Sequence, residues 1–390
     1  MFPAEQTTSP SAGRRAWAEV DLAAIRHNAS LLSKLVAPAG LCAVVKAGGY
    51  GHGSVAVARA ALEGGASWLA VALVEEGAVL RDHDVDAPVL LLSEPPVEAM
   101  DDVVALRLIP TLYTEQGVEA AAKAVASAGA QPLTVHVKVD TGMHRVGASA
   151  DGAVGVVRAV ADHPELSFGG LWTHFAVADD PDHPFTAEQC ARFDAVIERL
   201  VTMGLRPPMA HACNSAGALG VPGARHDLVR CGIGLYGVAP SPALAAVQPA
   251  LVQDGDGLRP ALSLRADVSY VRRVAAGEAV SYGLRRPLER DATVATVPVG
   301  YADGVPWRLG VCGGEVLIGG RRRALAGSVT MDQILVDCGD DDGVLPGDEV
   351  VLLGRQGDEQ ITAWDWATSA GTIAYEVLCG IVPRVTKIYT

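Results

Sequence analysis

Short apolar segments alternate with longer stretches of helical spacing between residues 40 and 237. Eight of these segments, rich in β-branched residues and leucine, predict strands at 41–46, 68–72, 89–93, 109–114, 134–140, 168–175, 209–215 and 228–237. The stretches between them combine good helix formers with apolar positions three or four residues apart, which predicts helices. Because strand–helix alternation gives parallel strands, and eight such units close on themselves, the expected fold class is α/β with a (β/α)8 TIM-type barrel.

After the eighth strand the pattern changes to alternating apolar and polar residues between Gly, Asp and Pro turns, which is typical of antiparallel strands. Only one late stretch, 363–378, has helical spacing. The sequence therefore predicts four parts. They are an N-terminal arm (1–16), the barrel (17–240), a connector (241–260) and a smaller, mainly β C-terminal domain (261–390).

Composition narrows the class of partner. Hydrophobic residues make up 49% of the chain and charged residues 19%, which is typical of a compact globular protein. Acidic residues outnumber basic ones by 45 to 31, so the net charge of -14 argues against a nucleic-acid partner. The basic run Arg321–Arg323 is interpreted as a solvated strand edge, and the acidic run 339–343 as a surface turn.

The cysteines and the N-terminus bear on location. Seven cysteines are scattered along the chain without a C-x-x-C pair, which predicts buried thiols in a reducing compartment. The N-terminal segment lacks the apolar core of a signal peptide, and no later apolar run is long enough to cross a bilayer. A cytoplasmic protein without a membrane partner or a metal site is therefore expected.

Polar residues stand at the carboxyl ends of the predicted barrel strands, where barrel enzymes place their active sites. Packing of a barrel requires none of them. They are Lys46, Lys138, Asp140, His174, Asn214, Ser215, Arg230, Gly232 and Tyr236. The ends of the last two strands also resemble a phosphate site, because 214–217 offers a hydroxyl and a helix cap and 231–234 offers unobstructed backbone N–H groups.

Lys46 ends the first predicted strand and is followed by glycines at 48, 49, 51 and 53. A lysine beside a phosphate site matches the two anchors of pyridoxal phosphate, whose aldehyde forms a Schiff base with a lysine amine. The glycines would leave room for a flat ring and let Tyr50 turn inward. Taken singly, these features also suit a surface lysine and ordinary turn glycines. A nucleotide-binding P-loop is a poorer match, because its lysine follows the glycines.

Eight motifs in order resemble those of bacterial alanine racemases: VVKAGGYGHG, KVDTGMHRVG, THFAVAD, HACNS, RCGIGLYG, VSYG, VGYADG and TMDQ. The resemblance covers nearly the whole chain. It implies a pyridoxal-phosphate enzyme that interconverts L- and D-alanine and supplies D-alanine for peptidoglycan. It also implies a homodimer in which each active site combines the barrel of one chain with the β domain of the other.

The resemblance implies two catalytic bases, Lys46 and Tyr282 of the partner subunit. Racemisation requires groups on both faces, since one base cannot readily serve both. The tyrosine would lie near His174 and Arg230, and Arg230 would face the cofactor's ring nitrogen and keep the ring a weak electron sink. From the residues alone, Tyr282 could also be an ordinary strand aromatic, and Arg230 could form a salt bridge with Asp227.

The same comparison implies further roles. Arg145 would contact the cofactor's phenolic oxygen and the substrate, supported by Lys138, which is carbamylated in some family members; an ion pair between Lys138 and Asp140 is the alternative. Tyr301 and Met331 would border the substrate carboxylate, with Asp332 near the entrance. The residues expected to bind the cofactor are Lys46, Tyr50, Arg145, His174, Asn214, Ser215, Arg230, Gly232, Ile233 and Tyr375.

Two positions depart from the family pattern, which usually has a larger polar residue, often asparagine, where this chain has Gly48 and alanine where it has Gly49. A roomier loop could admit serine or larger amino acids, so a broader racemase is an alternative. A decarboxylase of the same architecture is another, although such enzymes generally place a carboxylate where this chain has Arg230. A non-catalytic cofactor carrier would lack residues 261–390.

Overall fold

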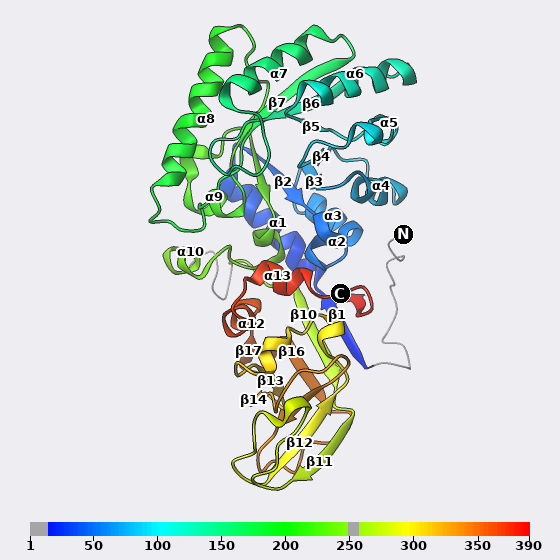
Figure 1. Ribbon diagram of the computed structural model, residues 1–390, viewed down its shortest axis with the longest axis vertical. Helices are drawn as coiled ribbons and strands as arrows, with labels where there is room; N and C mark the ends of the chain where they lie inside the picture. Colours follow the sequence, from blue (N-terminus) through cyan, green and yellow to red (C-terminus); the bar gives the residue numbers. More distant parts are fainter. Residues whose placement is uncertain (1–14, 249–256) are drawn as a thin grey trace. The chain divides into compact units, whose positions relative to one another are not determined.

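The structure is a computed structural model that describes residues 15–248 and 257–390 (Figure 1). The chain forms two compact units. The β unit contains residues 15–22, 50–53 and 260–390, and the barrel unit contains residues 23–49, 54–248 and 257–259. Residues 249–256 of the expected connector lie outside the described residues, and the connector begins with a short helix, α10 (Pro242–Val247).

Eight strands of the barrel unit correspond to the eight predicted segments. They are β2 (Gly40–Val44), β3 (Trp68–Val71), β4 (Val89–Leu91), β5 (Thr111–Leu112), β6 (Leu133–Lys138), β7 (Leu166–Trp172), β8 (Ala210–His211) and β9 (Leu228–Cys231). All pairs are parallel, in the orders β4-β3-β2-β9 and β5-β6-β7-β8.

Short contacts join these two sheets. A parallel bridge links Leu90 with Ile109. The backbone N–H of Arg230 donates to the Cys213 carbonyl oxygen (3.0 Å). The predicted (β/α)8 barrel is therefore confirmed, with strands shorter than their apolar segments.

Helices alternate with these strands along the chain and lie outside them (Figure 1). They are α1 (Leu22–Val36), α3 (Ser54–Glu63), α4 (Val74–Asp82), α5 (Met100–Ala105), α6 (Glu115–Ala128), α7 (Ala150–Asp162), α8 (Phe185–Thr202) and α9 (Ser215–Gly220). Helix α7 shows why they form: the Ser149 hydroxyl caps its first turn and a stripe from Ala153 to Val160 is buried.

The β unit consists mainly of antiparallel strands, as predicted. Its large sheet has the order β14-β13-β16-β10-β1-β18, with β17 paired to β16, and its small sheet has the order β11-β12-β15. The strands are β1 (Ala16–Val20), β10 (Leu262–Asp267), β11 (Tyr270–Val274), β12 (Ala292–Val297), β13 (Glu315–Ile318), β14 (Arg321–Ala324), β15 (Ile334–Asp337), β16 (Glu349–Gln356), β17 (Glu359–Ile361) and β18 (Thr386–Tyr389).

Strand β1 differs from the expectation that residues 17–240 form the barrel. It pairs antiparallel with β10 and parallel with β18, so it belongs to the large sheet of the β unit. Its buried residues, Ala16, Ala18 and Val20, alternate with more exposed ones, as in a strand that packs one face on a core. This local pattern carries no information about which distant strands become its partners.

Two further expectations need correction. The predicted helix 363–378 is two helices, α12 (Ala363–Ala370) and α13 (Ala374–Cys379), because Gly371 adopts a left-handed conformation that ends the first. Among the seven thiols, four are buried, but Cys312 and Cys379 are exposed.

Strand β14, which carries the basic run, lies at the edge of its sheet as expected. No described helix is long and apolar enough to span a membrane, and no group of three potential metal ligands occurs among the described residues.

Candidate active site

The residues after Lys46 form a left-handed turn. Strand β2 ends just before this lysine, and φ is 54° at Ala47, 61° at Gly48, 64° at Gly49 and 51° at Tyr50. For Ala47 this conformation costs roughly 1 kcal/mol, so the surrounding contacts must hold it. A Cβ at Gly48 would meet nothing within 4 Å, whereas one at Gly49 would lie 3.2 Å from the backbone of Ser54.

Arg230 is buried inside the barrel. Its Nη1 lies 2.6 Å from His211 Nδ1, and its Nη2 donates to the carbonyl oxygens of Thr173 (2.7 Å) and Ala212 (2.8 Å). Burial lowers the Arg230 pKa to about 10, which leaves the guanidinium charged at neutral pH. Asp227 instead accepts from the backbone N–H of Ala210 (2.7 Å), so a salt bridge with Asp227 does not explain the position of Arg230.

Two histidines extend this arrangement, and the sequence interpretation missed both. Burial, followed by the charge of Arg230, lowers the pKa of His211 well below its usual value and that of His136 to about 4, so both are neutral at pH 7. Because arginine can only donate, His211 Nδ1 accepts, and its Nε2 donates to His136 Nδ1 over 2.9 Å. The sequence did contain a signal for them: both histidines alternate with apolar neighbours on β6 and β8, as side chains that point into the barrel do.

His174 lies near the other terminal nitrogen of the guanidinium, with its Nδ1 3.4 Å from Arg230 Nη2. Burial lowers its pKa well below the usual range, and the charges of Arg230, Lys138, Arg145 and Lys46 act in the same direction. The structure therefore brings His174 and Arg230 together, as the resemblance implied, with His174 neutral at pH 7.

Lys138 is 3% exposed at the end of β6. Its Nζ lies 4.2 Å from the centre of the Trp172 ring, and burial, Arg230 and Arg145 lower its pKa to about 7. Asp140 accepts from the N–H of Gly142 (2.9 Å) and from His144. Asp140 therefore stabilises its own loop, and its charge only partly offsets the lowering of the Lys138 pKa.

The two predicted halves of the phosphate site meet in the barrel unit. The Ser215 hydroxyl accepts from the backbone N–H groups of Gly232 (2.9 Å) and Gly234 (3.3 Å). Asn214 caps α9 by accepting from the Gly217 N–H over 2.9 Å. A hydroxyl and converging amides therefore lie at the ends of β8 and β9, with Ile233 buried between them.

Three predicted side chains lie on the surface of the β unit. Tyr282 is 76% exposed, Met331 54% and Tyr301 45%. Hydrogen bonds connect their segments. The Ser328 hydroxyl donates to the Tyr282 carbonyl oxygen (2.9 Å), and the Tyr301 backbone N–H donates to the Thr330 carbonyl oxygen (3.0 Å). Tyr282 begins a short 3-10 turn, Tyr282–Leu284, so it is not the strand aromatic of the alternative interpretation.

Asp332 lies beside this group in an ion-pair bridge. Arg384 contacts Asp332 Oδ1 (2.6 Å) and Asp303 Oδ1 (2.7 Å), and Asp303 is fully buried. Asp303 also accepts from the Gly300 N–H over 2.9 Å, which fixes the turn that carries Tyr301. The bridge therefore connects the C-terminal segment to both turns of the predicted substrate region.

Tyr50 and Tyr375 also lie in the β unit. Their ring centroids are 6.4 Å apart at an interplanar angle of 47°, so the structure brings these two predicted cofactor-binding residues together. Close packing also requires glycine at position 51, because a Cβ there would collide with the carbonyl group of Leu378 in α13.

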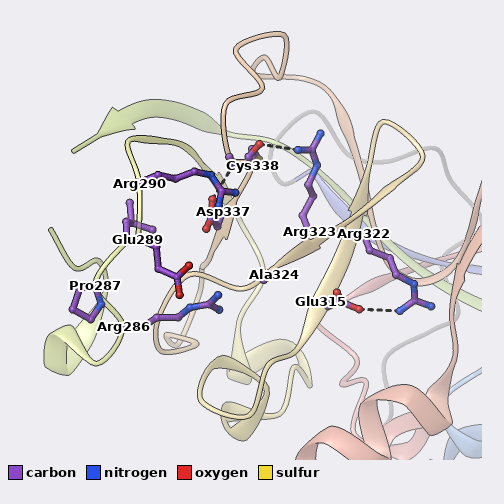
Figure 2. A pocket seen from close by; sticks show the side chains of 12 residues that line it. Arg286, Pro287, Glu289, Arg290, Glu315, Arg322, Arg323, Ala324, Asp337 and Cys338 are labelled. Atoms are coloured by element: carbon purple, nitrogen blue, oxygen red, sulfur yellow. Dashed lines mark hydrogen bonds and ion pairs between the residues drawn. The ribbon is translucent and has the colours of Figure 1, made fainter. Parts of the chain in front are cut away.

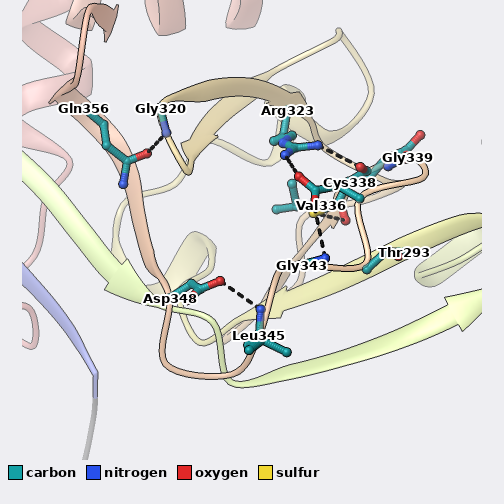
Figure 3. Close-up of polar contacts among 12 residues, drawn as sticks. Thr293, Gly320, Arg323, Val336, Cys338, Gly339, Gly343, Leu345, Asp348 and Gln356 are labelled. Carbon is teal, nitrogen blue, oxygen red and sulfur yellow. Dashed lines mark hydrogen bonds and ion pairs between the residues drawn. The ribbon is translucent and has the colours of Figure 1, made fainter.

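A separate pocket of about 320 Å³ lies within the β unit (Figure 2). Four arginines contribute to its lining. Arg322 pairs with Glu315 over 2.9 Å (Figure 2). Arg323 donates to the Cys338 carbonyl oxygen over 2.7 Å (Figure 3) and also pairs with Asp341. None of the predicted site residues lines it. Arg322 therefore joins β14 to β13, Arg323 joins β14 to the loop after β15, and the predicted site lies elsewhere.

The fold and the site define a class of two-domain proteins, in which a (β/α)8 barrel with a lysine at its first strand is followed by a mainly β domain. Residues 20–240 match the family model described as alanine racemase, N-terminal domain, and residues 261–389 match alanine racemase, C-terminal domain. The chain belongs to the alanine racemase family.

Known proteins agree over the full length. The chain is 44% identical over 378 residues to an alanine racemase of Symbiobacterium thermophilum, covering 96% of this chain and 97% of that protein. It is 42% identical to one from Thermobifida fusca, covering 96% and 97%. The crystal structure of the enzyme from Streptomyces lavendulae has a TM-score of 0.90 at 37% identity, covering 98% of each chain. That of Bacillus anthracis alanine racemase with bound L-Ala-P has a TM-score of 0.88 at 35% identity, covering 98% and 96%.

Proposed function

We propose that this protein is a pyridoxal-phosphate-dependent racemase that interconverts L- and D-alanine and supplies D-alanine for peptidoglycan. The observation that carries the proposal is Arg230, a charged guanidinium buried against neutral His211 in a chain whose two parts both match alanine racemases. A decarboxylase of similar architecture favours a carboxylate at this place, to keep the cofactor ring protonated.

The residues present fit the cofactor. The Ser215 hydroxyl accepts from the Gly232 and Gly234 N–H groups, so its own proton can be donated to a phosphate, and Lys46 supplies an amine for the aldehyde. Arg230 can only donate, so it would meet an unprotonated ring nitrogen. When bound, the cofactor supplies an electron-withdrawing ring that makes the substrate Cα–H acidic. Tyr50 and Tyr375 are proposed as further phosphate ligands, and Arg145 as a contact of the phenolic oxygen.

Lys46 would hold and move a proton on one face of the substrate Cα. Tyr282 of the partner subunit would do the same on the opposite face, because inversion requires proton removal and return from opposite sides. The exposure of Tyr282 supports this assignment, since a phenol that is 76% exposed in one chain is available to a second chain. Tyr301 and Met331, exposed on the neighbouring turns, would then border the substrate carboxylate, with Asp332 near the entrance.

Lys138 is proposed to carry a carbamate. Carbamates form when a neutral amine attacks carbon dioxide, and a lysine with a pKa of about 7 is substantially neutral at physiological pH. The product carries a negative charge, which the nearby Arg230 and Arg145 would stabilise. Mass spectrometry under mild conditions, with and without added bicarbonate, tests the modification.

One assay tests the proposed activity. Purified protein with added cofactor is incubated with each of several L-amino acids, and optical rotation, deuterium exchange at Cα and carbon dioxide release are followed. We expect loss of rotation with L-alanine, slower loss with L-serine and no carbon dioxide. Carbon dioxide release without racemisation would refute the proposal in favour of a decarboxylase. Absence of deuterium exchange at Cα with every amino acid tested would favour a non-catalytic carrier.

A further inference from the structure

The left-handed turn after Lys46 is held by a carboxylate from another strand–helix unit. Glu76, on α4, accepts from the Ala47 N–H through Oε1 over 2.6 Å. Its Oε2 accepts from the N–H groups of Ala72 (2.8 Å) and Leu73 (3.2 Å), which follow β3. One carboxylate therefore joins the carboxyl ends of β2 and β3, which are adjacent parallel strands in the barrel.

Capping of α4 accounts for the two contacts of Oε2 but not for the contact of Oε1 with Ala47. Leu73 is the N-cap residue and offers no side-chain oxygen, and Glu76 at the third helical position satisfies its N–H, as glutamate often does there. That function uses Oε2 alone. The contact between Oε1 and Ala47 adds nothing to the helix, and it falls on the residue immediately after the proposed reactive lysine.

The turn is fixed at a second point by its own backbone, because the Gly49 N–H donates to the Val45 carbonyl oxygen over 2.9 Å. Lys46 therefore lies between an anchor on Val45 and an anchor on Ala47. Ala47 is exposed and has φ of 54°, an unfavourable conformation for alanine, so without the carboxylate its backbone would be free to relax. Such a relaxation would turn the peptide that carries Lys46 and move the side-chain amine.

We propose that Glu76 is a positioning residue for Lys46: its carboxylate clamps the left-handed turn to the end of β3 and so sets the direction of the lysine side chain. This inference rests on the proposed function, in which the Lys46 amine bonds the cofactor and transfers the substrate proton.

A shortened side chain tests the clamp. Glu76→Asp keeps the charge on α4 but withdraws it by one carbon–carbon bond, so it can no longer reach Ala47 and Leu73 together. Glu75→Asp is the matched control, because Glu75 is the preceding residue of the same helix and is exposed. Holoenzymes are compared by kcat and KM for L-alanine, by melting temperature, and by the rate at which hydroxylamine removes the cofactor from Lys46, followed by absorbance.

We expect Glu76→Asp to lower kcat roughly 10- to 100-fold, the range expected when a reacting group is misplaced by about 1 Å, with KM changed much less. Hydroxylamine should release the cofactor several-fold faster, and Glu75→Asp should match the unaltered protein in every measurement. Glu76→Gln provides the second variant if the aspartate protein does not fold, since its amide has the same length but only one acceptor oxygen.

Three outcomes decide whether Glu76 positions Lys46. Equal kcat and release rates for Glu76→Asp and Glu75→Asp overturn the inference. A lower melting temperature with an unchanged release rate also overturns it, since that result describes a helix cap alone. If the unaltered protein does not racemise alanine but releases cofactor from Lys46 more slowly than Glu76→Asp, the clamp is supported and the proposed activity is refuted.

Discussion

The interior of the barrel and the surface of the β unit supply the candidate site in opposite ways. Three partners of Arg230 are fixed within one chain: His211, Thr173 and Ala212 are buried and hydrogen-bonded to the guanidinium. Around Tyr282 the backbone is fixed, but the side chain is exposed. The barrel therefore sets the electrostatics of the site by itself, whereas the β unit presents groups that gain a defined environment only against another surface.

The most direct way to break this comparison is to separate the two bases onto different chains. Lys46→Ala and Tyr282→Phe proteins should each lose at least about 10³-fold in activity, because each removes one proton-transfer group. Dissociating and reassociating an equal mixture should restore about a quarter of the unaltered activity, because half of the dimers would be mixed and each would contain one intact site.

The control mixes either variant with itself, which should restore nothing. Full activity of Tyr282→Phe in both directions, or a mixture as inactive as its components, would contradict the sharing of sites between subunits.

A second change tests the phosphate site of the barrel unit. Ser215→Ala removes the hydroxyl that accepts from Gly232 and Gly234, and we expect cofactor affinity to fall about tenfold, which corresponds to the loss of one hydrogen bond to a charged group. Equilibrium dialysis of pyridoxal phosphate measures the affinity. Thr186→Ala, at another buried hydroxyl, should leave it unchanged; equal affinities for the two variants would contradict a phosphate site at Ser215.

Acid should weaken the protein through its buried histidines. The pKa of His136 falls from 6.5 unfolded to about 4 folded, so the unfolded chain binds more protons between these values. Stability present above pH 6.5 is therefore lost as the pH falls toward 4, by up to about 1.4 kcal/mol per pH unit for each such histidine. Urea unfolding across this range measures the slope.

His136→Gln should reduce that slope, and His183→Gln, at an exposed position, should not. If the free energy of unfolding depends on pH equally in both variants, the pKa of His136 is not lowered by burial.

The smallest effect is expected at Gly48. Its φ of 61° favours glycine or asparagine, and a Cβ would enter open space, so Gly48→Asn should change the free energy of unfolding by less than about 0.5 kcal/mol. The informative measurement is the ratio of kcat/KM for alanine and serine. A ratio that rises for the asparagine variant would support a role of this glycine in substrate breadth, and an unchanged ratio would argue against it.

Much of this arrangement could be predicted from the sequence, because the buried parallel strands are continuous apolar runs and the site residues stand where those runs end. The meeting of Ser215 with Gly232 follows from two strand ends being neighbours in a barrel. Contacts between distant backbone groups could not be predicted in the same way. Nothing in the local pattern around Glu76 distinguishes a helix cap from a clamp on Ala47, and strand β1 alternates like any half-buried strand whatever its partners.

The pairing of β1 with β18 has a consequence for the synthesis of the chain. The first described strand, Ala16–Val20, leaves the ribosome long before its parallel partner, Thr386–Tyr389, has been made. The barrel strands all emerge in the interval and can assemble without waiting, since domains generally fold as units during translation. The large sheet of the β unit, in contrast, is complete only after Thr386–Tyr389 has been made, so deletion of these residues would leave β1 with an unpaired edge.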